Sequence, residues 1–232
     1  LRRRQRQMCI RDSFLTFSCG TDQTDNAAQP PSEGEEQSYI NAYQRSLLSD
    51  CEAGIDYPEP YPNIIRGPYL QMVGPDYIHI VWYTDRPANS VVKYGVGSIM
   101  FSVCDFTPTE RHEVVLQNLK PYTEYTYIVR SDGAQAGPFT FKTAPETMSD
   151  KPFRFGVYGD SRTHPERHRE VALGMFAEDP DLFIHVGDIV SDGRVFEQYD
   201  DEFFEPAFEL FANTPFYVSI GNHERESPYY YE

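Results

Sequence analysis

The sequence has few basic residues, no long apolar run and few cysteines, and each shortage excludes a class of protein. Its 20 lysines and arginines stand against 36 aspartates and glutamates, which gives a net charge of -16. A nucleic-acid-binding face needs a basic surface, so we expect none. No apolar run approaches the roughly 20 residues of a membrane-spanning helix. The four cysteines show no CxxC spacing, which disfavours a zinc finger or a redox pair; a disulfide between Cys51 and Cys104 stays open.

Apolar residues are plentiful enough for real cores, since 40% of the 232 residues are hydrophobic and 15% are aromatic. The length predicts one or two globular domains. Residues 1–12, LRRRQRQMCIRD, resemble a translated sequencing adapter, and we interpret them as an artefact with no part in the fold. The alternative is the basic start of a signal peptide. Without these residues the net charge changes from -16 to -20, because five arginines and one aspartate are removed.

Residues 13–61 begin with a short apolar patch that ends at Cys19 and continue as a polar, acidic tract. Such a tract cannot bury a core, so we predict a disordered linker. The apolar patch followed by Ser18 and Cys19 resembles a bacterial lipoprotein signal, in which the cysteine carries the lipid; an ordinary signal peptide or a linker cysteine is the alternative. Both interpretations place the protein outside the cytoplasm, whether secreted, periplasmic or lipid-anchored at a bacterial cell envelope.

Residues 62–145 consist of short alternating segments such as YIHIVWYT, SVVKYG and TEYTYIVR. Alternation with aromatic and β-branched residues predicts antiparallel strands, and their regular spacing predicts a small all-β sandwich. The stretch LKPYTEYTYIVR resembles the corner before the penultimate strand of fibronectin type III domains, with Tyr125 as the corner tyrosine and Trp82 as a core ring. We expect this domain to serve architecture; a carbohydrate-binding or partner-binding module is the alternative.

Residues 152–232 show a different pattern, in which near-continuous apolar strands alternate with helices. The composition of these strands predicts that they are buried. The strands are FRFGVYGD, DLFIHVGD and PFYVSIGNHE. The first helix, PERHREVALGMFAED, carries an apolar stripe at Val171, Leu173, Met175 and Phe176; the second, RVFEQYDDEFFEPAFELFAN, is interrupted at Pro206. This order predicts an α/β domain with a parallel sheet and right-handed crossovers.

Each of the three strands ends in a glycine followed by a side chain that can bind a metal. The pairs are Gly159-Asp160, Gly187-Asp188 and Gly221-Asn222. They lie 28 and then 34 residues apart, which suits one crossover between adjacent parallel strands. Because ligands bind at the carboxyl ends of such strands, we expect the three oxygen ligands to meet at one rim of the sheet.

The ordered series GD, GD, GNHE closely resembles the calcineurin-like metallophosphoesterases, and with the opening RGPYLQ it resembles their purple acid phosphatase branch. The resemblance implies two metal ions, and the candidate elements are Fe, Mn and Zn. Asp160 would bind the first ion, Asp188 would bridge both and Asn222 would bind the second. His223 would stabilise or protonate the leaving oxygen, or alternatively only orient other groups. Two such ions clamp an in-line displacement and activate water.

Two positions depart from the family pattern. Ser191 stands where purple acid phosphatases have a ligand tyrosine, which disfavours a purple ferric centre. Arg162 stands where the wider superfamily has a histidine ligand, so the first ion is one ligand short. Arg162 is a candidate phosphate clamp, or else a surface arginine. His164 and His168 are candidates for the missing ligand, with an exposed capping or surface role as the alternative, and His185 is interpreted as a packing residue.

The chain ends at ESPYYYE before the two later histidine motifs of the family appear. We therefore predict a C-terminally truncated fragment that is itself inactive, from a parent that hydrolyses small phosphate esters. A phosphomonoesterase is the main expectation. One alternative is a phosphodiesterase or nucleotidase that uses the acidic helix at 197–209 for partner contacts. The other is a non-catalytic surface-binding protein with a degenerate phosphoesterase domain.

Overall fold

The structure is a computed structural model that describes residues 50–231. These residues fall in a single compact unit of the chain. The predictions for residues 1–12, for the lipid anchor at Cys19 and for most of the linker lie outside the described residues. Within the described part, no helix is long and apolar enough to cross a membrane.

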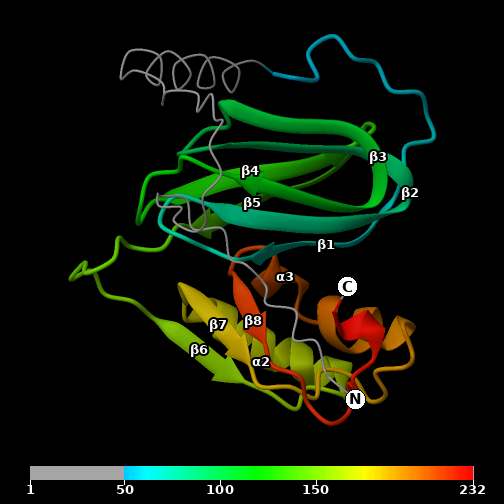
Figure 1. Cartoon of the computed structure of the whole chain (residues 1–232), viewed down its shortest axis with the longest axis vertical. Coiled ribbons are helices and arrows are strands. Elements are labelled where there is room, and N and C mark those ends of the chain that lie inside the picture. Colours follow the sequence, from blue (N-terminus) through cyan, green and yellow to red (C-terminus); the bar gives the residue numbers. More distant parts are fainter. Residues whose placement is uncertain (1–49, 232) are drawn as a thin grey trace, which may run out of the picture. The chain divides into compact units, whose positions relative to one another are not determined.

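The first half of the described chain forms one antiparallel sheet that folds over on itself (Figure 1). Its strands are β1 (Ile64–Gln71), β2 (Ile78–Gly95), β3 (Phe101–Leu116), β4 (Glu124–Ser131) and β5 (Ala134–Lys142). The long strand β2 pairs with β3 along most of its length, with β1 through its first half and with β4 through its second half. The two segments YIHIVWYT and SVVKYG, which sequence reasoning treated as separate, are therefore one strand.

The folded sheet encloses a core in which the two predicted aromatic residues lie as expected. Trp82 is fully buried, and its indole N–H donates to the Ser131 hydroxyl at 2.9 Å. The Tyr125 hydroxyl accepts the backbone N–H of Lys120 at 2.8 Å, five residues upstream. This bond ties the loop before β4 to the strand, as a tyrosine corner does.

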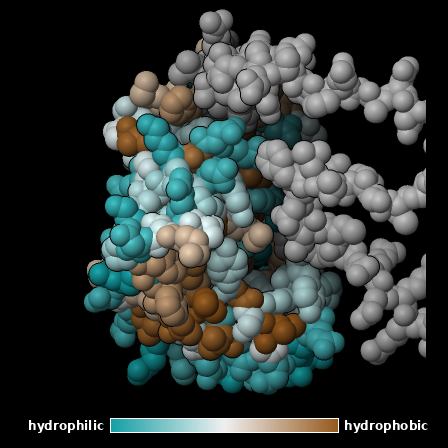
Figure 2. Space-filling view, turned by 60° about the vertical axis from the view of Figure 1, so that its left-hand side comes forward, coloured by the Kyte–Doolittle hydropathy of each residue, from teal (hydrophilic) through white to brown (hydrophobic). Residues whose placement is uncertain are grey.

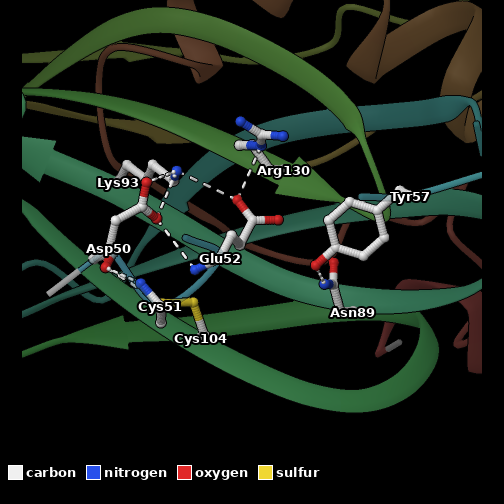
Figure 3. The surroundings of a disulfide bond; sticks show 9 residues. Asp50, Cys51, Glu52, Tyr57, Asn89, Lys93, Cys104 and Arg130 are labelled. Carbon is white, nitrogen blue, oxygen red and sulfur yellow. Dashed lines mark hydrogen bonds and ion pairs between the residues drawn. A yellow bond between two sulfur atoms is a disulfide. The ribbon is translucent and has the colours of Figure 1, made fainter. Parts of the chain in front are cut away.

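The segment just before the sheet is attached to it by covalent and ionic contacts (Figure 3). Cys51 and Cys104 form a disulfide with a Cα–Cα distance of 6.3 Å, so the pairing left open by the sequence is present. Glu52 is buried, and its carboxylate lies 3.0 Å from Arg130 Nε and 3.5 Å from Lys93 Nζ. The predicted disordered linker therefore does not extend to residue 61.

The second half of the described chain forms a three-stranded parallel sheet in the order β6-β7-β8. Its strands are β6 (Phe155–Tyr158), β7 (Leu182–His185) and β8 (Phe216–Val218). The crossover elements are α2 (Pro165–Ala177), the π-helix η1 (Tyr199–Phe204) and α3 (Phe208–Phe211), and a 3-10 turn η2 (Pro228–Tyr230) follows β8. The predicted α/β order and the interruption of the second helix around Pro206 are both present.

Two burial predictions in this half are wrong. Strand β6 lies at the edge of the sheet, and Phe155 and Val157 are 59% and 52% exposed rather than buried. On α2, the predicted stripe residues Val171, Leu173 and Phe176 are also exposed. Figure 2 shows a hydrophobic surface patch on the side of the molecule where β6 lies.

The face of α2 that packs inward is formed by His168, Ala172 and Met175, of which only Met175 belongs to the predicted stripe. His168 and Ala172 are buried, and Met175 packs against the same core. Their spacing of i, i+4 and i+7 is that of one helix face. The predicted stripe did not follow this spacing, because the histidine was counted as polar.

The antiparallel sheet packs directly against the helices of the α/β half. Tyr69 and Val81 share a buried cluster with Phe183, Phe211 and Phe216. The Tyr127 hydroxyl donates to the Ala212 carbonyl at 2.6 Å, and Asn213 accepts a backbone N–H from Thr140 at 2.8 Å. The sheet and the α/β half therefore share one buried cluster, and the architectural role of the sheet stays a prediction.

Arg66 on β1 provides the main ionic contact across this interface. Its guanidinium donates to both carboxylate oxygens of Asp200 on η1, at 2.5 and 2.9 Å, and its side chain is 8% exposed. The same guanidinium lies 4.7–4.9 Å from the ring centroids of Tyr83, Phe196 and Phe204. The planar fork of arginine therefore serves a bidentate bond and ring stacking at once.

We expect Arg66→Met to lower the free energy of unfolding by about 2 kcal/mol, because the Asp200 carboxylate loses a largely desolvated partner. Arg66→Lys should recover only part of the loss, since lysine lacks the fork. Urea unfolding followed by circular dichroism measures both. The control is Arg169→Gln, which breaks an exposed pair with Glu209 and should cost less than about 1 kcal/mol. Equal losses for Arg66→Met and the control would contradict the prediction.

Candidate active site

The loops that follow β6, β7 and β8 meet at the carboxyl edge of the parallel sheet. The backbone N–H of Asp160 donates to the Gly187 carbonyl at 3.0 Å, which joins the first two loops. Gly187 has a φ of +95°, and a Cβ at this residue would lie 2.8 Å from the backbone nitrogen of Gly221. The second and third loops therefore approach so closely that only glycine fits between them.

Asp160 and Asp188 each follow one of these strands in the left-handed backbone region, with φ values of 56°. Aspartate and asparagine tolerate this region better than most other residues. The conformation directs both side chains away from continued strand geometry and toward the rim. Exchange of either aspartate for asparagine therefore removes charge without adding backbone strain.

Arg162 lies between the two carboxylates. Its Nη1 donates to Asp160 Oδ1 at 2.6 Å, and its Nη2 lies 3.8 Å from Asp188 Oδ2. The other oxygen of Asp188 accepts the backbone N–H of His223 at 3.0 Å. Asn222 directly precedes His223 in the same loop and is exposed. The structure thus brings the loops of all three predicted ligands to one rim, with one guanidinium at its centre.

The His223 ring is oriented by a backbone carbonyl. Its Nδ1 lies 2.7 Å from the carbonyl oxygen of Ser191, so Nδ1 carries the proton and donates it. Nε2 has no hydrogen bond among the described residues and is the nitrogen that can exchange a proton with a ligand. The carbonyl of His223 in turn accepts the N–H of Gly193 at 2.8 Å.

Glu224 holds the second and third loops together, a role that sequence reasoning missed. The residue is fully buried, and Oε1 accepts the Ile189 N–H at 2.7 Å. Oε2 accepts the N–H groups of Asp188, at 3.1 Å, and of Gly221. A carboxylate at the end of an apolar strand, within the GNHE stretch, was the only signal available in the sequence.

Glu202 on η1 plays a similar part for the first and second loops. Its carboxylate accepts the backbone N–H of Ser191 at 2.7 Å and that of Thr163 at 3.1 Å. The Ser191 hydroxyl also lies 2.9 Å from both carboxylate oxygens. Ser191 is therefore part of a loop anchor, and its hydroxyl is already engaged.

The three histidines considered as ligands or packing residues have distinct surroundings. His164 is exposed and lies 3.7 Å from Glu166. His168 is buried, so the exposed capping role proposed for it is wrong; its Nδ1 bonds to the Glu202 carbonyl and its Nε2 to the Tyr158 hydroxyl. With both nitrogens in use, His168 has no free nitrogen for a metal. His185 is fully buried against aromatic rings, as predicted for a packing residue.

Burial changes the proton affinity of the two inner histidines. Desolvation lowers the pKa of His168, although its bond to the Glu202 backbone opposes the shift. Desolvation lowers the pKa of His185 to about 4, with a further decrease from His168 and a small opposing effect of Asp188. Both rings are therefore neutral at neutral pH and serve packing.

The rim carries the right kind of donor for a metal but too few of them for two ions. Carboxylate and amide oxygens suit divalent cations, and Asp160, Asp188 and Asn222 provide them. Over residues 50–231, however, no cluster of three or more histidine, cysteine, aspartate and glutamate side chains is arranged to hold a metal. Arg162 also places a positive charge between the two carboxylates. The described residues alone do not complete a dinuclear centre.

Gly221 offers a test of this packed rim. A Cβ at this residue would lie 2.2 Å from Asp188 Oδ1 and 2.4 Å from the Asp188 nitrogen. We expect Gly221→Ala to displace the Asp188 carboxylate and to lower the free energy of unfolding by about 2–3 kcal/mol through overpacking.

The matched control is Gly174→Ala in α2, where a Cβ would meet nothing within 4 Å. That exchange should stabilise the protein by about 0.5–1 kcal/mol, because alanine favours the helix. Chemical unfolding of both variants measures the two changes in the free energy of unfolding, which should have opposite signs. If Gly221→Ala left the free energy of unfolding unchanged, the loops after β7 and β8 would not approach each other as closely as described.

Comparison with known proteins gives a consistent result. Residues 153–232 match the family model described as Calcineurin-like phosphoesterase. A probable purple acid phosphatase 20 of Arabidopsis thaliana is 29% identical over 170 residues, which cover 68% of this chain and 38% of the relative. Acid phosphatase type 7 of Danio rerio is 25% identical over 169 residues, which cover 62% of this chain and 36% of the relative.

Two solved structures share the fold. The structure of PhoD superposes with a TM-score of 0.59 at 12% identity, over 73% of this chain and 40% of that one. The purple acid phosphatase PPD1 from yellow lupin superposes with a TM-score of 0.57 at 20% identity, over 70% of this chain and 36% of that one. The chain thus spans less than two-fifths of the length of the curated relatives. The resemblance drawn from GD, GD and GNHE is confirmed.

Proposed function

We propose that this chain, which carries a calcineurin-like phosphoesterase domain of the purple acid phosphatase-like branch, is part of a metal-dependent phosphoric ester hydrolase. Small phosphate monoesters are the proposed substrates. The observation that carries the proposal is the meeting of Asp160, Asp188 and the loop of Asn222 and His223 at one rim.

In this proposal Asp160, Asp188 and Asn222 hold two metal ions together with ligands from outside the described residues. When bound, the ions activate water and neutralise charge on the phosphoryl oxygens. Fe, Mn and Zn are the proposed metals. A ferric purple centre is disfavoured, because Ser191 replaces the ligand tyrosine and its hydroxyl faces Glu202.

Arg162 and His223 handle the substrate in this proposal. Arg162 presents a guanidinium at the rim, and its fork matches two oxygens of a phosphoryl group once the carboxylates bind metal. His223 has a fixed ring and a free Nε2, so its protonated form can donate to the leaving oxygen.

A non-catalytic role is the second candidate. The chain is also 27% identical over 136 residues to a probable inactive purple acid phosphatase 27 of Arabidopsis thaliana, of which it covers 22%. The guanidinium of Arg162 between the two carboxylates favours this alternative, since it offsets charge that a metal would otherwise neutralise. A phosphodiesterase or nucleotidase uses the same chemistry and differs only in substrate.

Activity and metal content separate these candidates. The 232-residue chain and a longer protein that contains it are assayed with an aryl phosphate monoester and the matching diester, in Mn, Zn or Fe. We expect hydrolysis of the monoester by the longer protein, near two ions per chain, loss of turnover in Asp188→Asn, and little activity of the 232-residue chain alone. Strong activity of that chain would show that its donor count suffices. A longer protein without metal or turnover would favour the non-catalytic role.

We also propose a location outside the cytoplasm. The Cys51–Cys104 disulfide supports it, because such bonds persist in oxidising compartments. A lipid anchor at Cys19 is the proposed form of attachment. Fractionation of cells that express the wild type and Cys19→Ser tests it, with release of the variant from membranes as the expected result.

A further inference from the structure

A cavity opens beside the rim, between the loop after β6 and the first turns of α2. Its volume is about 460 Å³. Asp160 and Arg162 form the side shared with the candidate site, and His164 and Arg167 contribute further polar groups. Tyr158 and Val171 supply apolar wall. The cavity is thus continuous with the residues proposed to bind the transferred phosphoryl group.

The side chains of this cavity are unusually basic for a chain with a net charge of -16. Two arginines and two histidines, His164 and the buried His168, line it against one carboxylate, that of Asp160. Glu166, which does not line the cavity, lies 3.7 Å from His164. Because Arg162 is paired with Asp160 at 2.6 Å, the positive charge left in this lining is that of Arg167, and such a charge attracts anions.

Two of these cationic groups have donors without acceptors. The side chain of Arg167 forms no hydrogen bond or ion pair within the described part of the chain, whereas the side chain of Arg169, two residues along α2, pairs with Glu209 at 2.7 Å. The Nε of Arg162 is buried and also has no hydrogen-bond partner. A buried N–H without an acceptor is costly, so an oxygen-bearing ligand would gain by filling this place.

We propose that this cavity binds a second anionic group of the substrate, a phosphate or carboxylate carried by the leaving group. The inference rests on the proposed function, since it assumes that the scissile phosphate lies at the rim. Arg167 would bind the second anion, Arg162 would lie between the two anions, and the apolar wall would contact the atoms that link them. The preferred substrates are then phosphate esters with two anionic ends.

Binding of simple anions tests the cavity without any turnover. The probes are inorganic phosphate and inorganic pyrophosphate, measured by isothermal titration calorimetry on the full 232-residue chain at low ionic strength. We expect pyrophosphate to bind more tightly than phosphate. Arg167→Gln should weaken pyrophosphate binding about 5- to 10-fold, the equivalent of one charge-assisted hydrogen bond, and change phosphate binding little.

The matched control is Arg169→Gln, which removes the same charge from the same helix outside the cavity. It should leave both affinities unchanged. Equal weakening by the two variants would mean that only the general charge of the helix matters, and it would overturn the inference. So would the absence of pyrophosphate binding, or an affinity no higher than that for phosphate.

A kinetic experiment on the longer protein separates failure of the inference from failure of the proposed function. Arg167→Gln should raise KM for a substrate with two phosphate groups about 5- to 10-fold and leave KM for an aryl phosphate unchanged. If the longer protein hydrolyses both substrates and Arg167→Gln changes neither KM, the inference about the cavity is wrong while the proposed function stands. Pyrophosphate binding that depends on Arg167, without hydrolysis of any ester, overturns the proposed function alone.

Discussion

Glu224→Ala is expected to lower the free energy of unfolding by about 4 kcal/mol and to separate the loops after β7 and β8. The carboxylate is fully buried and accepts three backbone N–H groups, those of Asp188, Ile189 and Gly221. Each buried donor left without an acceptor costs about 1–3 kcal/mol. Water that enters the space left by the side chain would recover part of this cost.

Glu224→Gln should lie between the wild type and Glu224→Ala. The amide oxygen of glutamine can still accept a hydrogen bond from a backbone N–H, but its NH2 group must then face at least one other backbone N–H, and two donors cannot bond to each other. We expect a loss of about 2 kcal/mol. The matched control is Glu226→Gln, two residues along the chain, where the side chain is exposed and the exchange should change stability by less than about 0.5 kcal/mol.

Two measurements distinguish loss of the anchor from general destabilisation. Urea unfolding gives the free energies, and native-state hydrogen exchange reports the amides of Asp188 and Ile189 directly. Faster exchange at these two amides in Glu224→Gln, with unchanged exchange in the β2 core, is the expected result. Uniform acceleration across both halves, or the same loss in Glu226→Gln, would show that Glu224 has no special part in the site.

The backbone of the candidate site was predictable from sequence because local chemistry decides it. An apolar strand followed by glycine and a potential ligand occurs three times in the sequence, and parallel strands align their carboxyl ends. The structure accordingly pairs β6 with β7 and β7 with β8 in parallel and joins the following loops. Tyr125 was predictable for a similar reason, since its bond to Lys120 lies within five residues of the chain.

The features that sequence reasoning missed depend on contacts between distant segments. Glu202 and Glu224 each bind loops that lie 11 to 39 residues away along the chain, and no periodic pattern marks such a residue. The exposure of β6 follows from its place at the sheet edge, which its composition does not disclose. His168 was misplaced because a histidine with both ring nitrogens bonded packs like an aromatic residue.

His112 gives the second large prediction, which concerns stability at low pH. The ring is fully buried in the antiparallel sheet and stacks on Trp82 at 4.8 Å between centroids. Its nitrogens lie 2.8 Å from the hydroxyls of Ser90 and Thr84. Desolvation lowers the pKa of His112 from its ordinary value of 6.5 to about 4.

The sign of the effect follows from where the proton binds first. As the pH falls below 6.5, the unfolded chain takes up a proton at His112 while the folded protein does not. Stability from this residue is therefore complete above pH 6.5 and is lost as the pH falls toward 4. At about 1.4 kcal/mol per pH unit, the loss amounts to about 3 kcal/mol across this range.

His112→Phe isolates this contribution, because it keeps a ring against Trp82 and cannot titrate. Near pH 7.5 the variant should be about 1–2 kcal/mol less stable than the wild type, since Ser90 loses its partner. Between pH 6.5 and 4.5 the difference should shrink and then reverse. His168 and His185 titrate in both proteins, so their effects cancel in the comparison, which is made by urea unfolding at several pH values. A difference that does not change with pH would mean that the folded protein protonates His112 as readily as the unfolded chain does.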